Sequence, residues 1–183
     1  MQGSQILTAT EKEFFDHEIS IGVTPDNPDY WALMDGTANI IQNYAKNVIE
    51  IGAGMGTLGE CLVSKGVNYY GIEPNQYHQA FAKNRGQLLH GLDDYPNRCG
   101  MIVTIEVFEH LTDEQINEYL ENIDAKYLYF SSTPYTTTPE FDSWWGHINI
   151  KQIDEWIEFF AEYGYTLERR LTIPTDWTLL FRK

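Results

Sequence analysis

Short apolar runs and amphipathic stretches alternate along this chain, and together they predict its secondary structure. Runs of β-branched and aromatic residues are typical of buried strands, whereas apolar residues three and four positions apart are typical of helices. The predicted strands cover residues 48–51, 69–73, 87–90, 100–105, 126–131, 165–171 and 177–183. The predicted helices cover residues 11–19, 30–44, 55–65, 76–85, 113–123 and 151–163. Strands that alternate with helices and end in a β-hairpin fit an α/β fold with a doubly wound parallel sheet and one antiparallel strand at the end.

Turn-forming residues separate these elements. Thr112 is a good helix N-cap, and a glutamine three positions later completes an approximate capping box. In residues 22–28, Pro25 and Pro28 are expected to prevent a helix from continuing. The longest segment without a predicted element covers residues 132–147, which contain many turn formers and four aromatic residues. A loop of this length inside a compact domain is usually functional.

Length and composition indicate one globular domain. The 183 residues are 43% hydrophobic and 14% aromatic, which is enough to form a full core. We expect residues 1–29 to form an N-terminal cap segment and residues 30–183 to form the single domain. No apolar run is long enough to cross a bilayer, and the polar N-terminus lacks the features of a signal peptide. The sequence therefore predicts a cytoplasmic protein without a membrane partner, and it carries no signal for an oligomeric state.

A glycine-rich stretch at residues 48–59 joins a predicted strand to a predicted helix. Glycines at such a junction let the backbone turn sharply and approach a ligand closely, so a nucleoside-bearing cofactor is predicted here. Gly54-x-Gly56-x-x-Gly59 satisfies the dinucleotide fingerprint, and the acidic Glu73 follows at about the expected distance. This pattern alone fits NAD as well as S-adenosylmethionine.

Three features separate these two cofactors. Many residues precede the strand, whereas a dinucleotide fingerprint usually lies near the start of its domain. Glu50 and Gly52 extend the glycine pattern to E-I-G-A-G-M-G, which resembles motif I of the class I S-adenosylmethionine-dependent methyltransferases. Residues 69–74 resemble that family's second strand and ribose-binding acid, and residues 101–111 resemble its fourth strand and E-V-L-E-H-L signature. The resemblance covers the chain from about Tyr30 to the C-terminus. It implies a Rossmann-like, mostly parallel seven-stranded sheet with a C-terminal antiparallel β-hairpin.

The resemblance also implies where S-adenosylmethionine, and its product S-adenosylhomocysteine, would bind. In the family, the glycine-rich turn packs against the methionyl part of the cofactor, and Glu50 would bind the amino group directly or through water. Glu73 would accept hydrogen bonds from both ribose hydroxyls. Asp93 is preferred to Asp94 as the acid near the adenine amino group. The implied cofactor-binding residues are Glu50, Gly52, Gly54, Gly56, Glu73, Asp93, Ile105 and Glu106.

The E-x-x-E-H segment offers residues for proton transfer or for metal binding. Methyl transfer requires in-line positioning, exclusion of water and, for hydroxyl acceptors, removal of a proton. We predict catalytic roles for His110, His147 and Glu109, because histidine is available as a base near neutral pH. The segment also resembles the metal-binding set of small-RNA 3′-end 2′-O-methyltransferases and of ubiquinone-pathway O-methyltransferases. Glu106, Glu109, His110 and His147 are therefore candidate ligands of Mg²⁺ or Mn²⁺. Many metal-free members of the family carry the same signature, so a metal is not the favoured interpretation.

Charge restricts the methyl acceptor. The chain has 12 basic and 27 acidic residues, a net charge of −15, and Lys126 is the only basic residue between positions 98 and 151. In the family this segment forms the mouth of the substrate site, so its field should repel polyanions and favour neutral or cationic substrates. Tyr135, Trp144 and Trp145 are the predicted acceptor-contacting residues.

The predicted function is transfer of a methyl group from S-adenosylmethionine to a small molecule, with oxygen favoured over nitrogen as the accepting atom. Three alternatives stay open. A metal-assisted RNA 2′-O-methyltransferase is disfavoured by the charge, because nucleic-acid binding requires a basic surface. An NAD(P)-dependent oxidoreductase and a catalytically silent cofactor-binding module are the alternatives from other classes.

Overall fold

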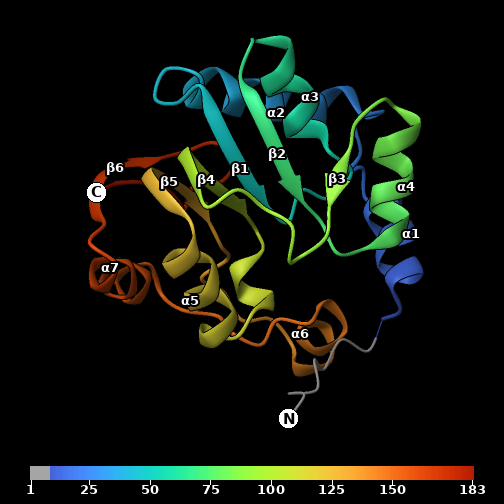
Figure 1. The fold of residues 1–183 in the computed structure, drawn as a ribbon. Helices are drawn as coiled ribbons and strands as arrows, with labels where there is room; N and C mark the ends of the chain where they lie inside the picture. Colours follow the sequence, from blue (N-terminus) through green and yellow to red (C-terminus); the bar gives the residue numbers. More distant parts are fainter. Residues whose placement is uncertain (1–8) are drawn as a thin grey trace.

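A seven-stranded sheet runs through the part of the chain that the computed structural model describes, residues 9–183 (Figure 1). Its strands are β1 (Asn47–Ile51), β2 (Asn68–Ile72), β3 (Leu89–His90), β4 (Arg98–Ile105), β5 (Asp124–Ser131), β6 (Thr166–Leu171) and β7 (Thr178–Arg182). They lie in the order β3-β2-β1-β4-β5-β7-β6, in which β7 is antiparallel to both neighbours and the other pairs are parallel. The predicted α/β fold with a C-terminal antiparallel hairpin is confirmed.

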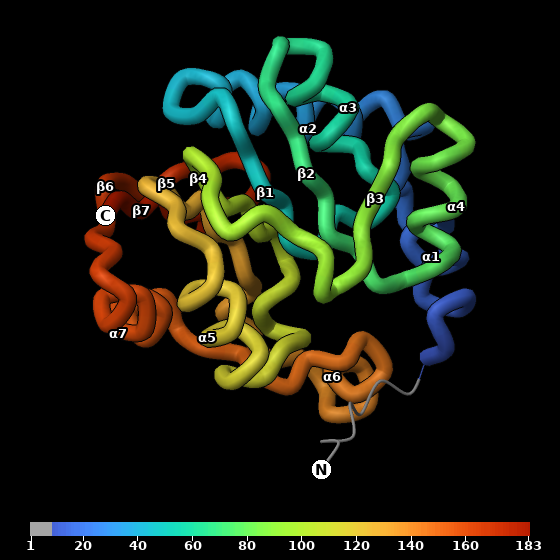
Figure 2. The backbone as a smooth tube through the Cα atoms, in the orientation of Figure 1, coloured from blue at the N-terminus to red at the C-terminus, as the bar shows by residue number. Residues whose placement is uncertain are grey.

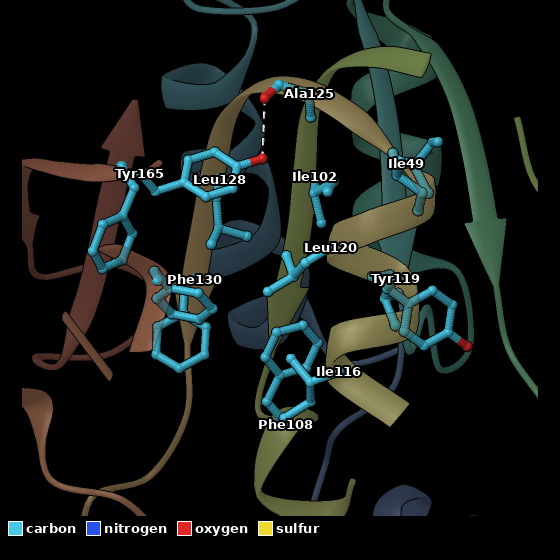
Figure 3. Close-up of a cluster of buried hydrophobic side chains, with 14 of the residues drawn as sticks. Ile49, Ile102, Phe108, Ile116, Tyr119, Leu120, Ala125, Leu128, Phe130 and Tyr165 are labelled. Atoms are coloured by element: carbon cyan, nitrogen blue, oxygen red, sulfur yellow. Dashed lines mark hydrogen bonds between the residues drawn. The ribbon is translucent and has the colours of Figure 1, made fainter. Parts of the chain in front are cut away.

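Helices cover both faces of this sheet. They are α1 (Glu11–Ser20), α2 (Pro28–Ile41), α3 (Thr57–Ser64), α4 (Gln76–Asn84), α5 (Asp113–Asn122), α6 (Pro139–Trp145) and α7 (Ile153–Glu162), with a 3-10 turn at Phe108–His110. On one face, Ile116 and Leu120 of α5 share a buried cluster with Ile49 and Leu128 of the sheet (Figure 3). Phe160 of α7 belongs to the same cluster. Within residues 9–183, no helix is long and apolar enough to cross a membrane.

The opposite face of the sheet is covered by α2 and α3. Val48 of β1 belongs to a second buried cluster there, with Ile41 of α2 and Leu62 of α3. Val48 and its neighbour Ile49 therefore belong to different clusters, as expected because successive side chains of a strand point to opposite faces. Burial on both faces explains why the predicted strands read as continuous apolar runs.

Two helix boundaries differ from the predicted ones for local reasons. The sequence predicts that Pro28 prevents a helix from continuing. In the structure Pro28 is instead the first residue of α2, where the N–H that proline lacks would have no partner within the helix. The side chain of Asn27 caps this helix by accepting a hydrogen bond from Asp29 N at 3.0 Å. Helix α3 begins at Thr57 rather than at residue 55, because Gly56 has a left-handed backbone.

The segment predicted to be a loop, residues 132–147, contains the short helix α6. Thr138 is its N-cap, Pro139 is its first residue, and Gly146 ends it with φ of +76°. These are ordinary cap and stop residues, so the local signal was present in the sequence. The predicted capping box of Thr112 at the start of α5 is confirmed. Of the predicted cap segment, residues 1–8 lie outside the described residues.

The strand order places a ligand site at one end of the sheet. Between β1 and β4 the order of connection reverses, so the loops that follow these two strands run to opposite faces. Doubly wound sheets bind ligands beyond the carboxyl ends of their strands at such a point. The glycine-rich turn after β1, the segment after β2 and the E-x-x-E-H segment after β4 all lie at this edge.

Candidate active site

A cavity of about 930 Å³ lies at the carboxyl ends of β1, β2 and β4. It is lined by the glycine-rich turn, by the segments that follow β2 and β4, by α1 and α2, and by parts of residues 133–148. Among the described residues that line it are several carboxylates and three histidines, but no lysine or arginine. The cavity is therefore unsuited to an anionic ligand group that needs a side-chain cation.

The glycine-rich turn forms an open cradle at the floor of this cavity. Gly52, Gly54 and Gly56 have φ values of +72°, +52° and +79°, a backbone conformation that favours glycine. A Cβ on Gly52 would lie 2.3 Å from the side chain of Val107. By contrast, no atom lies within 4 Å of the position that a Cβ on Gly54 would take, although Gly54 lines the cavity. The backbone here thus leaves space against which a ligand can pack.

Glu50, at the end of β1, places a buried carboxyl group beside this cradle. Only 4% of the residue is exposed, and its Oε2 accepts a hydrogen bond from the Tyr69 hydroxyl at 2.5 Å. Burial raises the pKa of Glu50 to about 8; the Tyr69 hydrogen bond opposes this shift, and the charge of Glu73 adds to it. A buried carboxyl group that lines a cavity without cations is suited to bind an ammonium group of a ligand.

Glu73 follows β2 and is held by backbone amides. Its Oε2 accepts a hydrogen bond from Gly54 N, and its Oε1 accepts one from Asn75 N, both at 2.8 Å. A carboxylate offers about four acceptor positions, so both oxygens can still accept hydroxyl donors. The residue is 6% exposed and lines the cavity.

Two further predicted cofactor residues also line the cavity. Asp93 is exposed in the loop after β3, whereas the neighbouring Asp94 is absent from the lining and has its carboxylate 3.3 Å from Nδ1 of His90. Ile105 ends β4 at the cavity wall.

Glu106 has an unusual backbone and an engaged side chain. Its φ of +55° is the only positive value at a non-glycine residue in the described part of the chain. Its carboxylate accepts hydrogen bonds from the Ser131 hydroxyl and from Trp177 Nε1, the latter at 2.9 Å. Burial raises the pKa of Glu106. Backbone strain of this kind is frequent at functional sites.

The three predicted catalytic residues come together at the far side of the cavity. One ligand-type atom from each of Glu109, His110 and His147 lies within 4.8 Å of the others, and the two imidazole centroids are 5.0 Å apart. The backbone brings them together, because the carbonyl oxygen of Glu109 accepts hydrogen bonds from Ile148 N at 2.8 Å and from Asn149 N at 3.0 Å. This cluster has the donor types of a metal site as well as those of a proton-transfer site.

Burial gives Glu109 and His110 unusual proton affinities. Burial, reinforced by the charge of Glu106, raises the pKa of Glu109 well above its usual range, although its Oε2 accepts a hydrogen bond from the Ser132 hydroxyl at 2.8 Å. Burial and the nearby His147 lower the pKa of His110 to about 4. His110 is therefore neutral at physiological pH and can accept a proton or a hydrogen bond.

Sequence reasoning missed Asp142, which orients His147. Its Oδ1 lies 3.4 Å from Nδ1 of His147, and its backbone carbonyl accepts a hydrogen bond from His147 N at 2.8 Å. Hydrogen bonds from the hydroxyl and backbone N–H of Thr137 lower the pKa of Asp142. A carboxylate at Nδ1 favours the tautomer whose Nε2 is free to accept a proton. Helix α6 contains Asp142 and ends just before His147, which brings the two side chains together across five positions.

Helix α1 crosses the cavity and joins its two sides. The Phe14 ring lies 5.0 Å from that of Trp145 in α6, between centroids. On the other side, the Phe15 ring lies 5.9 Å from that of Phe81 in α4. Phe14 and Glu18 of α1 line the cavity. The sequence predicted a cap segment but gave no indication of these partners.

The predicted acceptor-contacting residues differ in position. Tyr135 and Trp145 line the cavity, and Tyr135 is 63% exposed at its mouth. Trp144 is not part of the lining; its ring lies 4.9 Å from that of His17 in α1 and 5.3 Å from that of Trp145. Trp144 therefore contacts the cap helix.

Comparison with known protein sequences shows similarity to methyltransferases. A family model described as a methyltransferase domain matches residues 31–169. An uncharacterized methyltransferase from Bacillus cytotoxicus is 35% identical over 86 residues, which is 42% of this chain and 40% of that protein. The match thus spans less than half of the relative's length.

Solved structures with the same fold are methyltransferases of low sequence identity. Magnesium protoporphyrin IX methyltransferase from Synechocystis, with bound S-adenosylhomocysteine, aligns with a TM-score of 0.66 at 15% identity, over 98% of this chain and 91% of that one. A methyltransferase from Haloferax volcanii, in complex with the activator Trm112, aligns with a TM-score of 0.67 at 16% identity, over 91% of this chain and 95% of that one.

Proposed function

Because this chain belongs to the class I S-adenosylmethionine-dependent methyltransferases, we propose that it methylates a small molecule, with oxygen favoured as the accepting atom. One observation carries the proposal. A single cavity joins the Glu50 and Glu73 carboxyl groups at one end to the His110 and His147 imidazoles at the other, and helix α1 covers it. A donor and an acceptor can meet there away from bulk water.

The residues of this cavity fit the cofactor. Glu50 would bind its ammonium group, and the open backbone at Gly54 would contact its methionyl part. Glu73, held by two backbone amides, would accept hydrogen bonds from the ribose hydroxyls, and Asp93 would lie near the adenine amino group. When bound, S-adenosylmethionine supplies an activated methyl group on a sulfonium. The protein must then orient the acceptor and remove its proton.

Asp142 and His147 are suited to remove that proton. We assign His147 the role of general base, with its Nε2 taking the acceptor's hydroxyl proton while Asp142 stabilises the imidazolium that forms. His110, whose pKa is lowered to about 4, would accept a hydrogen bond from the acceptor. When bound, the cofactor would supply the methyl group to the acceptor oxygen and leave as S-adenosylhomocysteine, while His147 would hold the proton that the oxygen loses.

Charge and enclosure support a small, non-anionic acceptor. The described cavity lining has no lysine or arginine, and the chain has a net charge of −15. A nucleic acid would meet repulsion rather than phosphate contacts. The exposed apolar side chains of Tyr135, Phe141 and Ile148 all line the cavity, which favours an acceptor with an apolar body.

The cluster of Glu109, His110 and His147 also supports a second candidate, in which a divalent metal binds the acceptor hydroxyl. We favour proton transfer over metal binding, because the carboxylate of Glu106, the fourth candidate ligand, is engaged by Ser131 and Trp177.

A binding assay followed by a transfer assay tests the proposed function. S-Adenosylmethionine and S-adenosylhomocysteine should raise the melting temperature of the protein, whereas NAD should not. Methyl-labelled cofactor should then transfer label to the low-molecular-weight fraction of a metabolite extract. His147→Asn should abolish transfer and leave cofactor binding intact, while His90→Asn, outside the cavity, serves as the matched control.

Three results would overturn this assignment. Stabilisation by NAD alone would indicate an oxidoreductase. Tight cofactor binding without label transfer to any fraction would indicate a silent module. Label found in RNA or protein would reject the small-molecule acceptor.

A further inference from the structure

A buried histidine on α4 lies between two carboxylates that belong to different parts of the fold. Nε2 of His78 is 2.5 Å from Oε2 of Glu18 in the cap helix α1, and Nδ1 is 3.5 Å from Oε1 of Glu73. His78 is only 2% exposed. It faces the same cavity end as the carboxylate to which we assign ribose binding. The methyl-transfer scheme above gives this histidine no role.

Aromatic rings and acidic groups surround His78. Phe14 and Phe15 of α1 pack their rings at centroid distances of 6.2 and 5.3 Å from the imidazole. The charged groups that face it are Glu18 from α1 and Glu73 from the end of β2; Glu50 and the Tyr30 hydroxyl lie farther along the same cavity. The groups nearest His78 are therefore acidic or aromatic.

The imidazole is protonated in this setting. Burial alone would lower the pKa of His78, but the adjacent carboxylates of Glu18 and Glu73 raise it to about 9. At neutral pH the ring is then an imidazolium that lies between two carboxylates.

We propose that His78 is a positioning residue for cofactor binding, which fixes Glu73 toward the ribose and at the same time latches the cap helix α1 over the cavity through Glu18. This inference rests on the proposed function. Two backbone amides already hold Glu73, and the imidazolium adds a third, charged contact on Oε1. Among the described residues, the pair of His78 with Glu18 is the only ion pair that joins α1 to another element.

This contact couples closure of α1 over the cavity to cofactor binding, so that each should favour the other. Helix α1 runs beside α4 (Figure 2), and its other polar links are the Glu11 carbonyl, which accepts from Asn75 Nδ2 at 2.9 Å, and the Glu11 carboxylate, which accepts from Gln76 Nε2 at 3.0 Å. A ligand that binds better when α1 is closed must also stabilise the closed position of α1. Loss of the latch should therefore weaken cofactor binding without changing the chemistry at the acceptor.

A double-mutant cycle tests this coupling. Glu18→Gln and His78→Gln should each weaken the binding of S-adenosylhomocysteine about tenfold, and the double variant should be no weaker than the weaker single variant. Asp16→Asn is the matched control, because it makes the same carboxylate-to-amide change on the exposed side of α1. In kinetics, KM for S-adenosylmethionine should rise while kcat stays within about twofold of the parent value, since His78 touches no acceptor atom.

Hydrogen exchange adds a readout that a purely structural role would not give. S-Adenosylhomocysteine should slow amide exchange in α1 of the parent protein and lose this effect in Glu18→Gln. If His78→Gln does not fold, the comparison of Glu18→Gln with Asp16→Asn decides alone. Equal affinities for those two variants, or losses that multiply in the double variant, would overturn the latch. Failure of the parent protein to bind the cofactor at all would instead reject the proposed function.

Discussion

Binding of the cofactor should remove a proton from Glu50. In the protein without cofactor, burial holds the pKa of this carboxyl group at about 8, with Tyr69 and Glu73 as opposing smaller influences. At pH 7 about 0.9 of the molecules would therefore carry a protonated Glu50. An ammonium group brought beside Glu50 favours the carboxylate, because the opposite charge replaces the lost hydration.

The size of the proton release follows from these values. Glu50 would lose about 0.9 proton, and the free amino group of the ligand, with an α-amino pKa near 7.8, would take up about 0.1 as it becomes fully protonated. The net release should be about 0.8 proton per cofactor bound at pH 7. Affinity should accordingly increase as the pH rises from 6 toward 7.5, because less free energy is then needed to ionise Glu50.

Titration calorimetry measures this release directly. S-Adenosylhomocysteine is titrated at pH 7 in buffers with different ionisation enthalpies, and the slope of observed enthalpy against buffer enthalpy gives the number of protons exchanged. Glu50→Gln should bind more weakly and release none. A slope of zero in the parent protein, or an unchanged slope in Glu50→Gln, would refute the placement of the ammonium group at this carboxyl group.

Three further predictions concern the same cavity. Glu50→Gln should stabilise the cofactor-free protein at pH 7 by on the order of 3 kcal/mol, measured by urea unfolding. Because the pKa of Glu50 is raised in the folded protein, the stability present below pH 4.5 is lost as the pH rises toward 8. Equal stability of the parent protein and the variant at pH 7 would contradict this. Asp142→Asn should lower kcat by at least about tenfold and leave KM for the cofactor unchanged, whereas His90→Asn should change neither. Exhaustive chelation should leave activity intact, and activity that is lost and then restored by Mn²⁺ would instead assign Glu109, His110 and His147 to a metal.

The sequence predicted the cofactor side of the cavity because that side is encoded locally. Glu50 and Glu73 end parallel strands, and such ends meet at one edge of the sheet whatever the details of packing. The glycine pattern likewise indicates positive backbone φ angles, which glycine adopts more readily than any other residue type. His110 and His147 were identified as a pair, although their proximity depends on backbone hydrogen bonds from residues 148 and 149 to Glu109.

The residues that the sequence missed depend on tertiary packing between distant elements. The local sequence does not distinguish His78 from other helix residues. Only the packing of α1 against α4 brings Glu18, which is 60 positions away in the sequence, next to it. Asp142 lies in the segment predicted to be a loop, because the caps of α6 at Thr138 and Gly146 were not recognised. In both cases the neighbouring residues in the sequence do not indicate which side chain the residue contacts in the fold.

The carboxyl groups of the cavity explain how an acidic site can be stable when it is empty. Glu50 and Glu109 hold their protons because burial raises their pKa values, while Glu73 is balanced by two backbone amides and by the His78 imidazolium. Glu50 therefore stays uncharged until a cation enters, and a cationic cofactor allows it to ionise. A carboxylate or phosphate on the acceptor would find no free cation there, because the His78 imidazolium already lies between Glu18 and Glu73 and no lysine or arginine lines the described cavity; we therefore expect anionic acceptors to bind poorly.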